Sequence, residues 1–423
     1  MPGLSPKFPI PEPEPATARQ RATVAAMAAE HSTDRRTVRQ AARLRGIPTT
    51  IFSEMSALAA TTGALNLGQG FPDRDGPASV IEAAVNALRG GRNQYAPGPG
   101  VPELRAAVAR HQARHYGVEL DPWSQVIISA GATEAVAAAV FAFLDPGDEV
   151  VVLEPYYDSY LANIEMVGAV RRGVPLRAPD FRLDVDEMRA AVTDRTKAIL
   201  LNSPHNPTGS VLTRAELQGV ADIAIEHDLL VITDEVYEHL TFDDHEHLPL
   251  CTLPGMAERT VTISSAGKTF SFTGWKVGWV TGPADLVHAV ESAKQWLTFS
   301  NAAPLQPAVA HALDHEAAYY TELAAELQGK RDLLCEGLAK LDVDVHRPEG
   351  TYFVLTDVRR YGHTDGLAFC LALPERAGVV AIPTQGFYDD LDEGRHMVRW
   401  AFCKETAVLE EGIRRLTEAD LHA

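Results

Sequence analysis

Short apolar runs alternate with helical segments through the middle of the chain, and this alternation limits the possible folds more than any other feature. Each run has the length of a strand, and several are apolar at every position, as parallel strands buried on both faces are. The runs are residues 126–129, 149–153, 198–202, 229–233, 260–264 and 277–281. Helix-like segments lie between them at residues 133–144, 214–227 and 284–298. The pattern predicts an α/β fold with a mostly parallel central sheet.

The pattern changes after about residue 306, where long helices precede alternating strands at residues 352–357 and 397–402. These strands predict a smaller α+β domain, and 423 residues are enough for more than one core. We expect an N-terminal arm, a large domain, and a small domain formed by two separate segments. The arm, proline-rich and then rich in alanine and arginine, is expected to be poorly ordered or docked on the surface. The boundaries are residues 1–46 for the arm, 81–305 for the large domain, and 47–80 with 306–423 for the small domain.

Charge and cysteine content narrow the possible partners. A net charge of -19 argues against nucleic acid as the main partner, because binding to a polyanion relies on lysine and arginine. No run approaches the roughly 18 apolar residues that a membrane span needs. The four cysteines lack the paired spacing of a zinc site or a disulfide framework, so a cytoplasmic protein is expected. The run Asp243-Asp244-His245-Glu246-His247 is interpreted as a solvated loop, and no metal is assigned.

Polar residues follow two neighbouring strands of the predicted sheet. Asn206 lies in the loop after residues 198–202, and Asp234 follows residues 229–233, with Tyr237 three positions later. The carboxyl ends of parallel strands meet at the edge where open α/β sheets bind ligands. A carboxylate there would keep a pyridine nitrogen protonated, while an amide and a phenol could hydrogen-bond a ring oxygen. Taken singly, these residues are equally compatible with a turn, a helix cap and a core tyrosine.

Lys268 lies in a loop of small residues between two buried runs, which makes it a candidate for desolvation. Desolvation lowers the pKa of a lysine, and the neutral amine can form a Schiff base with an aldehyde. Lys276 and Ser265 are candidate phosphate ligands. A second phosphate candidate is the start of the helix at Ala132 and Thr133, because helix N-termini attract anions.

Arg399 shares one face of its predicted strand with apolar residues. A guanidinium in such a place needs a partner, and its planar fork suits a carboxylate held by two hydrogen bonds. An internal salt bridge or an exposed sheet edge would explain the residue equally well.

Five motifs, in their order along the chain, resemble those of the fold-type I, class I/II aminotransferases, which depend on pyridoxal 5'-phosphate (PLP). The resemblance runs from about residue 47 to the end. Within the family, the chain is similar to the branch of kynurenine aminotransferase and glutamine transaminase K. It is also similar to actinobacterial N-succinyldiaminopimelate aminotransferases. The motifs are Asn66-Leu67-Gly68-Gln69-Gly70-Phe71-Pro72-Asp73, Asn206-Pro207-Thr208-Gly209, Asp234-Glu235-Val236-Tyr237, Ser265-Ala266-Gly267-Lys268 with Gly274-Trp275-Lys276-Val277-Gly278, and Val398-Arg399-Trp400-Ala401-Phe402.

The resemblance implies a role for each residue around the cofactor ring. Lys268 would form the internal aldimine with PLP and carry a proton during catalysis. Asp234 would hold the pyridine nitrogen, Asn206 and Tyr237 would contact the ring oxygen, and Tyr157 would stack on the ring. The implied reaction is ping-pong transfer of an amino group from an L-amino acid to a 2-oxo acid.

The resemblance also implies how the cofactor phosphate is held. Ala132, Thr133, Ser265 and Lys276 would bind it, and Tyr95 would reach in from the second subunit of a homodimer. Many members of the family have arginine where this chain has Lys276. The lysine would replace the bidentate phosphate contact of the arginine by a point charge.

Substrate contacts follow from the same resemblance. Arg399 would clamp the substrate α-carboxylate beside Gly70 and Asn206, and Phe52 and Phe299 would form pocket walls. Two other functions use the same residues. One is a β-lyase acting on cysteine conjugates, because the same carbanion can expel a β-substituent. The other is a regulator that senses PLP and binds DNA through its arm.

The central role of Lys268 leads to a first prediction. The resting protein given PLP should show a visible absorbance that borohydride reduction removes, because reduction saturates the bond between the lysine and the cofactor. The variant Lys268→Ala should not show this absorbance. A wild-type protein that stays colourless in excess PLP would contradict the assignment.

Overall fold

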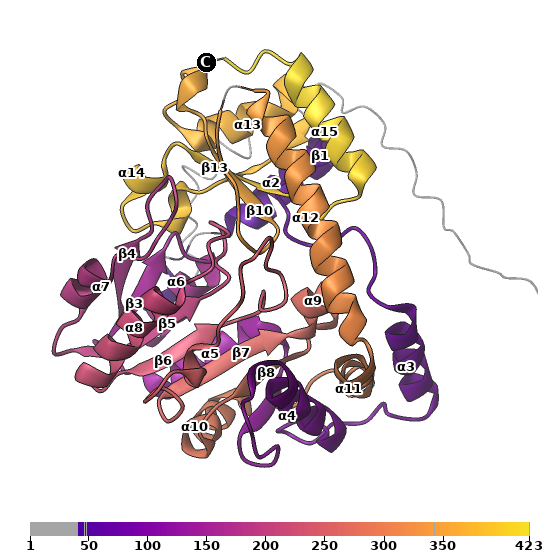
Figure 1. Cartoon of the computed structure of the whole chain (residues 1–423), viewed down its shortest axis with the longest axis vertical. Helices are drawn as coiled ribbons and strands as arrows, with labels where there is room; N and C mark the ends of the chain where they lie inside the picture. The colour runs from indigo at the N-terminus through magenta and orange to yellow at the C-terminus, as the bar shows by residue number, and fades with distance from the viewer. Residues whose placement is uncertain (1–40, 46, 48, 342, 423) are drawn as a thin grey trace, which may run out of the picture.

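The computed structural model describes residues 41–45, 47, 49–341 and 343–422, and its largest sheet has seven strands (Figure 1). The strand order is β2-β8-β7-β6-β5-β3-β4. The strands are β2 (Val126–Ser129), β3 (Glu149–Glu154), β4 (Val170–Pro175), β5 (Thr196–Asn202), β6 (Leu230–Asp234), β7 (Thr260–Ser265) and β8 (Gly278–Thr281). Strands β4, β3, β5, β6 and β7 pair in parallel, which confirms the predicted mostly parallel sheet.

Strand β8 runs antiparallel to both of its neighbours, β7 and β2. Parallel neighbours need a crossover connection, usually a full helix. The link from β7 to β8 contains only the short α9 (Ala266–Thr269) and a 3-10 helix (Thr273–Trp275), so the chain turns back beside β7. The edge strand β4 escaped sequence prediction because it is half-buried and carries Arg171 and Arg172.

Helices cover both faces of this sheet. One core joins Val152 and Ile232 to α5 (Gly131–Phe143), α6 (Asp158–Val167) and α10 (Ala284–Lys294). The opposite core joins Val151 and Val231 to α7 (Val185–Ala191) and α8 (Arg214–Glu226). Successive strand residues point to opposite faces, so burial on both faces explains why the runs are apolar at every position.

A second group of elements lies above the large sheet in Figure 1. Its four-stranded antiparallel sheet has the order β12-β13-β10-β9. The strands are β9 (Asp344–His346), β10 (Phe353–Asp357), β12 (Ile382–Pro383) and β13 (Met397–Ala401), and a separate parallel pair joins β1 (Leu65–Asn66) to β11 (Val379–Val380). Around them pack α2 (Ile51–Thr62), α12 (Ala317–Ala339), α13 (Gly366–Ala377) and α15 (Thr406–Glu418). The N-terminal and C-terminal segments thus lie together, while the domain boundaries stay a prediction.

The remaining α-helices of the described residues are α3 (Ala78–Arg89), α4 (Pro102–Tyr116), α11 (Gln306–His315) and the short α14 (Leu391–Gly394), and three further 3-10 helices lie at Leu250–Thr252, Arg359–Tyr361 and Gln385–Phe387. Of these, α3 and α4 both pack on α11. Over the described ranges, no helix combines the length and apolar character that crossing a lipid bilayer requires. The predicted arm lies outside the described residues except for residues 41–45, which include a 3-10 helix at Ala42–Leu44.

Candidate active site

The carboxyl ends of β5, β6 and β7 border a cavity of about 300 Å³ that β13 closes from the second sheet. Two of the predicted site residues, Tyr95 and Phe299, do not line it. Their side chains are 83% and 52% exposed and meet edge-on, with ring centroids 5.4 Å apart. The twelve predicted residues that do line the cavity are Phe52, Gly70, Ala132, Thr133, Tyr157, Asn206, Asp234, Tyr237, Ser265, Lys268, Lys276 and Arg399.

The pairing of β5 with β6 positions two of these residues. The register places Asn202 opposite Asp234, and the Asn202 amide donates a hydrogen bond of 2.8 Å to the Asp234 backbone carbonyl. Oδ1 of Asn202 also accepts a hydrogen bond of 2.7 Å from the backbone N–H of Asn206. Asn202, which the sequence did not single out, therefore fixes the loop that carries Asn206.

The Asp234 carboxylate is buried and held by two donors. Tyr160 donates from its hydroxyl to Oδ2 at 2.7 Å, and the N–H of Val236 donates to Oδ1 at 3.3 Å. Burial raises the pKa of Asp234 to about 6, against the opposing effect of the Tyr160 hydrogen bond. Sequence reasoning missed Tyr160, although a second tyrosine three residues after Tyr157 was the available signal.

The Lys268 amine is held between two groups that come from other parts of the chain. Nζ donates to the hydroxyl of Tyr352 at 2.6 Å and to the carbonyl of Gly70 at 3.3 Å. The same Tyr352 hydroxyl donates to the Gly70 carbonyl at 2.5 Å. Burial lowers the pKa of Lys268 to about 8, so part of the amine is neutral near neutral pH and can attack an aldehyde. Tyr352 was missed because its position just before β10 indicated only a strand.

The Arg399 side chain crosses from β13 into the cavity and is 2% exposed. Its Nη1 donates to Oδ1 of Asn206 at 3.0 Å, and its Nη2 donates to the carbonyl of Gly68 at 2.9 Å. Its Nε has no hydrogen-bond partner among the described residues. The guanidinium carbon lies 4.7 Å and 3.9 Å from the ring centroids of Phe52 and Phe353.

Arg399 fits neither an exposed sheet edge nor an internal salt bridge. The side chain is buried, so it does not lie at an exposed edge, and no described carboxylate forms an ion pair with it. Burial lowers its pKa to about 10, which leaves it protonated at neutral pH. A buried cation bound only by neutral acceptors, whose Nε–H has no partner among the described residues, is suited to an anionic ligand.

Helix α5 begins at the wall of the cavity, where Gly131, Ala132 and Thr133 line it, and it has no side-chain cap, so its first N–H groups remain available. Lys276 Nζ lies 3.3 Å from Oγ1 of Thr133, and Ser265 lines the same end. A Cβ at Gly278 would come within 2.7 Å of the backbone of Gly131, so only glycine allows β8 to approach the start of the helix so closely. These donors fit a phosphate, and together with Lys268 they fit a phosphorylated aldehyde such as PLP.

Comparison with known proteins supports this interpretation of the cavity. The family model for aminotransferase class I and II matches residues 62–416. The structure of N-succinyldiaminopimelate aminotransferase from Mycobacterium tuberculosis superimposes with a TM-score of 0.88 at 53% identity, covering 90% of this chain and 99% of that one. The methionine aminotransferase of Escherichia coli K12 is 39% identical over 376 residues, 89% of this chain and 97% of the relative. Human kynurenine–oxoglutarate transaminase 3 is 35% identical over 403 residues, 88% of each chain.

The lowered pKa of Lys268 predicts how the stability of the cofactor-free protein depends on pH. Well below pH 8 the lysine is charged in both the folded and the unfolded state, and well above its ordinary pKa of 10.5 it is neutral in both. Between these values the unfolded state holds more protons, so the free energy of unfolding should rise with pH through this lysine. Asp234 does not interfere, because it titrates between 3.8 and about 6.

Chemical denaturation of the cofactor-free protein at pH 7.5 and pH 10 measures this contribution. The variant Lys268→Met should gain most stability over the wild type at pH 7.5 and lose that advantage at pH 10. The exposed Lys197→Met is the matched control and should show no such pattern. An advantage of Lys268→Met that is equal at both pH values would contradict the assignment.

Proposed function

This chain belongs to the class I and II aminotransferase family and is a PLP-dependent enzyme, and from that premise we propose how its residues divide the work of amino-group transfer. The observation that carries the proposal is that one cavity is lined by both the Lys268 amine and the buried Arg399 guanidinium. A primary amine and a carboxylate clamp in one cavity suit the two groups that every α-amino acid carries. The relatives are named as aminotransferases, so a β-lyase is not favoured.

When bound, PLP supplies an aldehyde that condenses with primary amines and an electron-poor ring that stabilises negative charge at the substrate α-carbon. Lys268 would hold the cofactor through its amine and would move the proton at the substrate α-carbon. Tyr352 and the Gly70 carbonyl keep Nζ positioned for both tasks. The lowered pKa of Lys268 makes the neutral amine available for taking up that proton.

The ring of the cofactor is assigned to residues at the ends of β5 and β6. Asp234 would keep the pyridine nitrogen protonated, and Tyr160 orients the Asp234 carboxylate by the 2.7 Å hydrogen bond. Asn206 and Tyr237 would bind the ring oxygen, and Tyr157 would stack on the ring. Burial raises the pKa of Tyr237, so its phenol stays protonated and can donate to that oxygen.

Arg399 is assigned to the substrate α-carboxylate, beside Gly70 and Asn206, with Phe52 as one wall. Its free Nε supports this role, because a carboxylate can accept from two N–H groups of the guanidinium at once. The cavity is lined by only three cationic side chains among the described residues, and Lys268 and Lys276 are assigned to the cofactor. Arg399 is thus the one cation of this cavity left for the substrate.

A panel of amino donors tests the function. N-succinyldiaminopimelate, methionine and kynurenine are the first donors to try, because the named relatives act on such compounds. Each donor should bleach the visible absorbance of the cofactor, and 2-oxoglutarate or pyruvate should restore it. Release of pyruvate and ammonia from a β-substituted alanine without any oxo-acid acceptor would favour the lyase instead.

Arg399→Lys separates the proposed clamp from the rest of the site. It should raise the KM for amino donors about 10- to 100-fold, because a hydrogen bond to a charged group contributes about 1.5–3 kcal/mol. The cofactor absorbance should not change. Amines that lack the α-carboxylate should react equally poorly with the wild type and with Arg399→Lys. If the variant reacts with these amines more slowly than the wild type does, the result counts against the clamp.

A homodimer with shared active sites also belongs to the proposal. The Tyr95 side chain is 83% exposed and lies outside the cavity of its own chain, which supports its reaching the cofactor phosphate in a second subunit. There it would join Ala132, Thr133, Ser265 and Lys276. The reducing cytoplasm and a role in amino acid metabolism remain proposals as well; the four free cysteines support the former, and cell fractionation would check it.

Subunit mixing tests the shared site. At limiting PLP, Tyr95→Phe and Lys268→Ala should each be nearly inactive. Their mixture should recover about a quarter of wild-type activity, because random pairing makes half of the dimers hybrid and each hybrid has one intact site. If mixing restores nothing although both variants fold and exchange subunits, Tyr95 does not act across an interface.

A further inference from the structure

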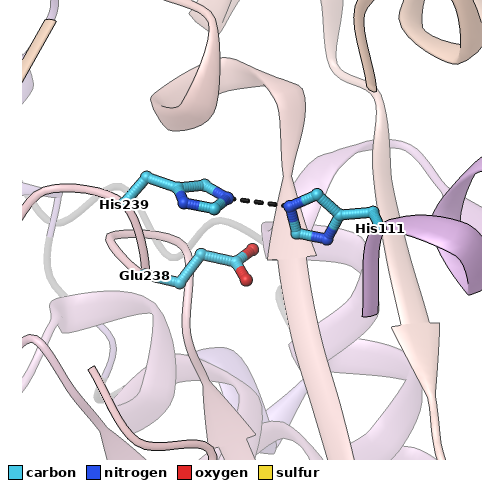
Figure 2. A group of neighbouring side chains, drawn as sticks. All are labelled: His111, Glu238 and His239. Atoms are coloured by element: carbon cyan, nitrogen blue, oxygen red, sulfur yellow. Dashed lines mark hydrogen bonds between the residues drawn. The ribbon is translucent and has the colours of Figure 1, made fainter. Parts of the chain in front are cut away.

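A second group of polar side chains lies buried outside the active-site cavity, between α4 and the turn that follows β6. Figure 2 shows His111, Glu238 and His239 pointing toward one another, and their candidate ligand atoms all lie within 4.8 Å of each other. His111 and Glu238 are 0% and 4% exposed. None of the three lines the active-site cavity, so the catalytic roles above do not account for them.

The hydrogen bonds within the group leave polar atoms unsatisfied. Nε2 of His111 and Nε2 of His239 are 2.8 Å apart, and Oε1 of Glu238 accepts a hydrogen bond of 2.5 Å from Ser264. Oε2 of Glu238 is buried and makes no close hydrogen bond among the described residues, although the Tyr116 phenol lies near enough to oppose the rise that burial causes in the pKa of this carboxyl. Leaving such an atom unpaired costs about 1–3 kcal/mol, so the Oε2 atom of Glu238 indicates a ligand.

His115 can complete the group from the solvent side. It lies one turn after His111 on α4, and this spacing puts two imidazoles on one helix face. Its ring centroid is 4.6 Å from that of His111 and 5.1 Å from that of His239. Because His115 is exposed, it offers an ion a path from water to the buried ligands.

The neighbouring aromatic ring restrains the group. Tyr320 stacks on His239 with centroids 4.0 Å apart and an interplanar angle of 1°. In a tetrahedral site with Zn–N bonds of about 2.0–2.1 Å, the distance between the two Nε2 atoms would increase by about half an ångström from its present 2.8 Å. A small movement of the partly exposed His239 within its stacking plane suffices for this change.

We propose that His111, Glu238 and His239, with His115 as the fourth ligand, bind one zinc ion. Three imidazoles and one carboxylate are ligands that tetrahedral zinc accepts, whereas calcium and magnesium require oxygen ligands. The ion would join α4 to the turn after β6, which carries Tyr237 and directly follows Asp234 at the end of that strand. The proposal does not depend on the assigned cofactor roles.

The acidic and histidine-rich run at residues 243–247 does not form such a site. His247 is paired with Glu235 at 2.8 Å, and Asp243 is paired with Arg331 at 2.7 Å. His245 lies 3.8 Å from Glu349. These side chains have different partners, so the run is not part of the proposed site.

Metal content of the full-length, PLP-loaded protein tests the proposal. The protein is stripped with a chelator, titrated with Zn²⁺ or Co²⁺, and separated from free metal before elemental analysis. About one zinc ion per chain is expected, and Co²⁺ should give the intense visible bands of a four-coordinate site. The melting temperature should rise on zinc binding, because the ion binds the folded state.

Matched variants decide whether the ion occupies this group. His111→Gln with His239→Gln should weaken zinc binding at least about 100-fold, since loss of even a supporting outer partner costs about 10- to 100-fold. His311→Gln with His315→Gln is the control, because this pair on α11 has the same spacing, with centroids 4.7 Å apart, and should leave zinc binding unchanged.

Three results would overturn the proposal: no zinc bound by the wild type, equal binding by the wild type and the His111/His239 variant, or loss of binding in the control pair. If the double variant does not fold, His115→Gln replaces it, because this residue is exposed; it should weaken zinc binding and change the Co²⁺ spectrum, and an unchanged affinity and spectrum would count against the site. A protein that keeps its PLP absorbance but takes up no zinc would refute this proposal and leave the proposed function intact.

Discussion

The register between β5 and β6 is the constraint on which the cavity depends. Because these strands pair in parallel, Asn202 lies opposite Asp234, and the Asn202 side chain ties the Asp234 backbone to the loop of Asn206. A slip of one residue would turn every side chain of β6 to the opposite face of the sheet. The Asp234 carboxylate would then leave the cavity.

The cavity also depends on holding two cations from different parts of the fold, the partly buried Lys268 and the buried Arg399. Lys268 follows a strand of the large sheet, whereas Arg399 lies on the four-stranded sheet. Neutral acceptors hold both groups: Tyr352 and Gly70 bind the amine, and Asn206 and Gly68 bind the guanidinium. Neutral acceptors leave the positive charge uncompensated, so a ligand that brings a carboxylate and a phosphate recovers interaction energy that the protein alone does not.

The short segment of residues 234–239, at the end of β6 and in the turn after it, contributes to two separate polar networks. Asp234 and Tyr237 face the cavity, while Glu238 and His239 face α4 and contact His111 and Ser264. A turn places these neighbours in sequence on opposite sides of the backbone. The position of the segment that carries Asp234 and Tyr237 therefore depends on the packing between the large sheet and α4, away from the reacting atoms.

The sequence by itself determined the α/β fold and most of the cavity. Apolar runs identified the seven-stranded sheet except for β4, because a strand buried on both faces must be apolar throughout, while an edge strand need not be. Asn206, Asp234 and Lys268 follow such strands, and the shared edge of a parallel sheet brings strand ends together. Only the tertiary structure identified Tyr160, Tyr352 and Asn202, because their importance lies in contacts with residues far along the chain. It likewise brought His111 within 2.8 Å of His239 across 128 positions, which no local spacing encodes.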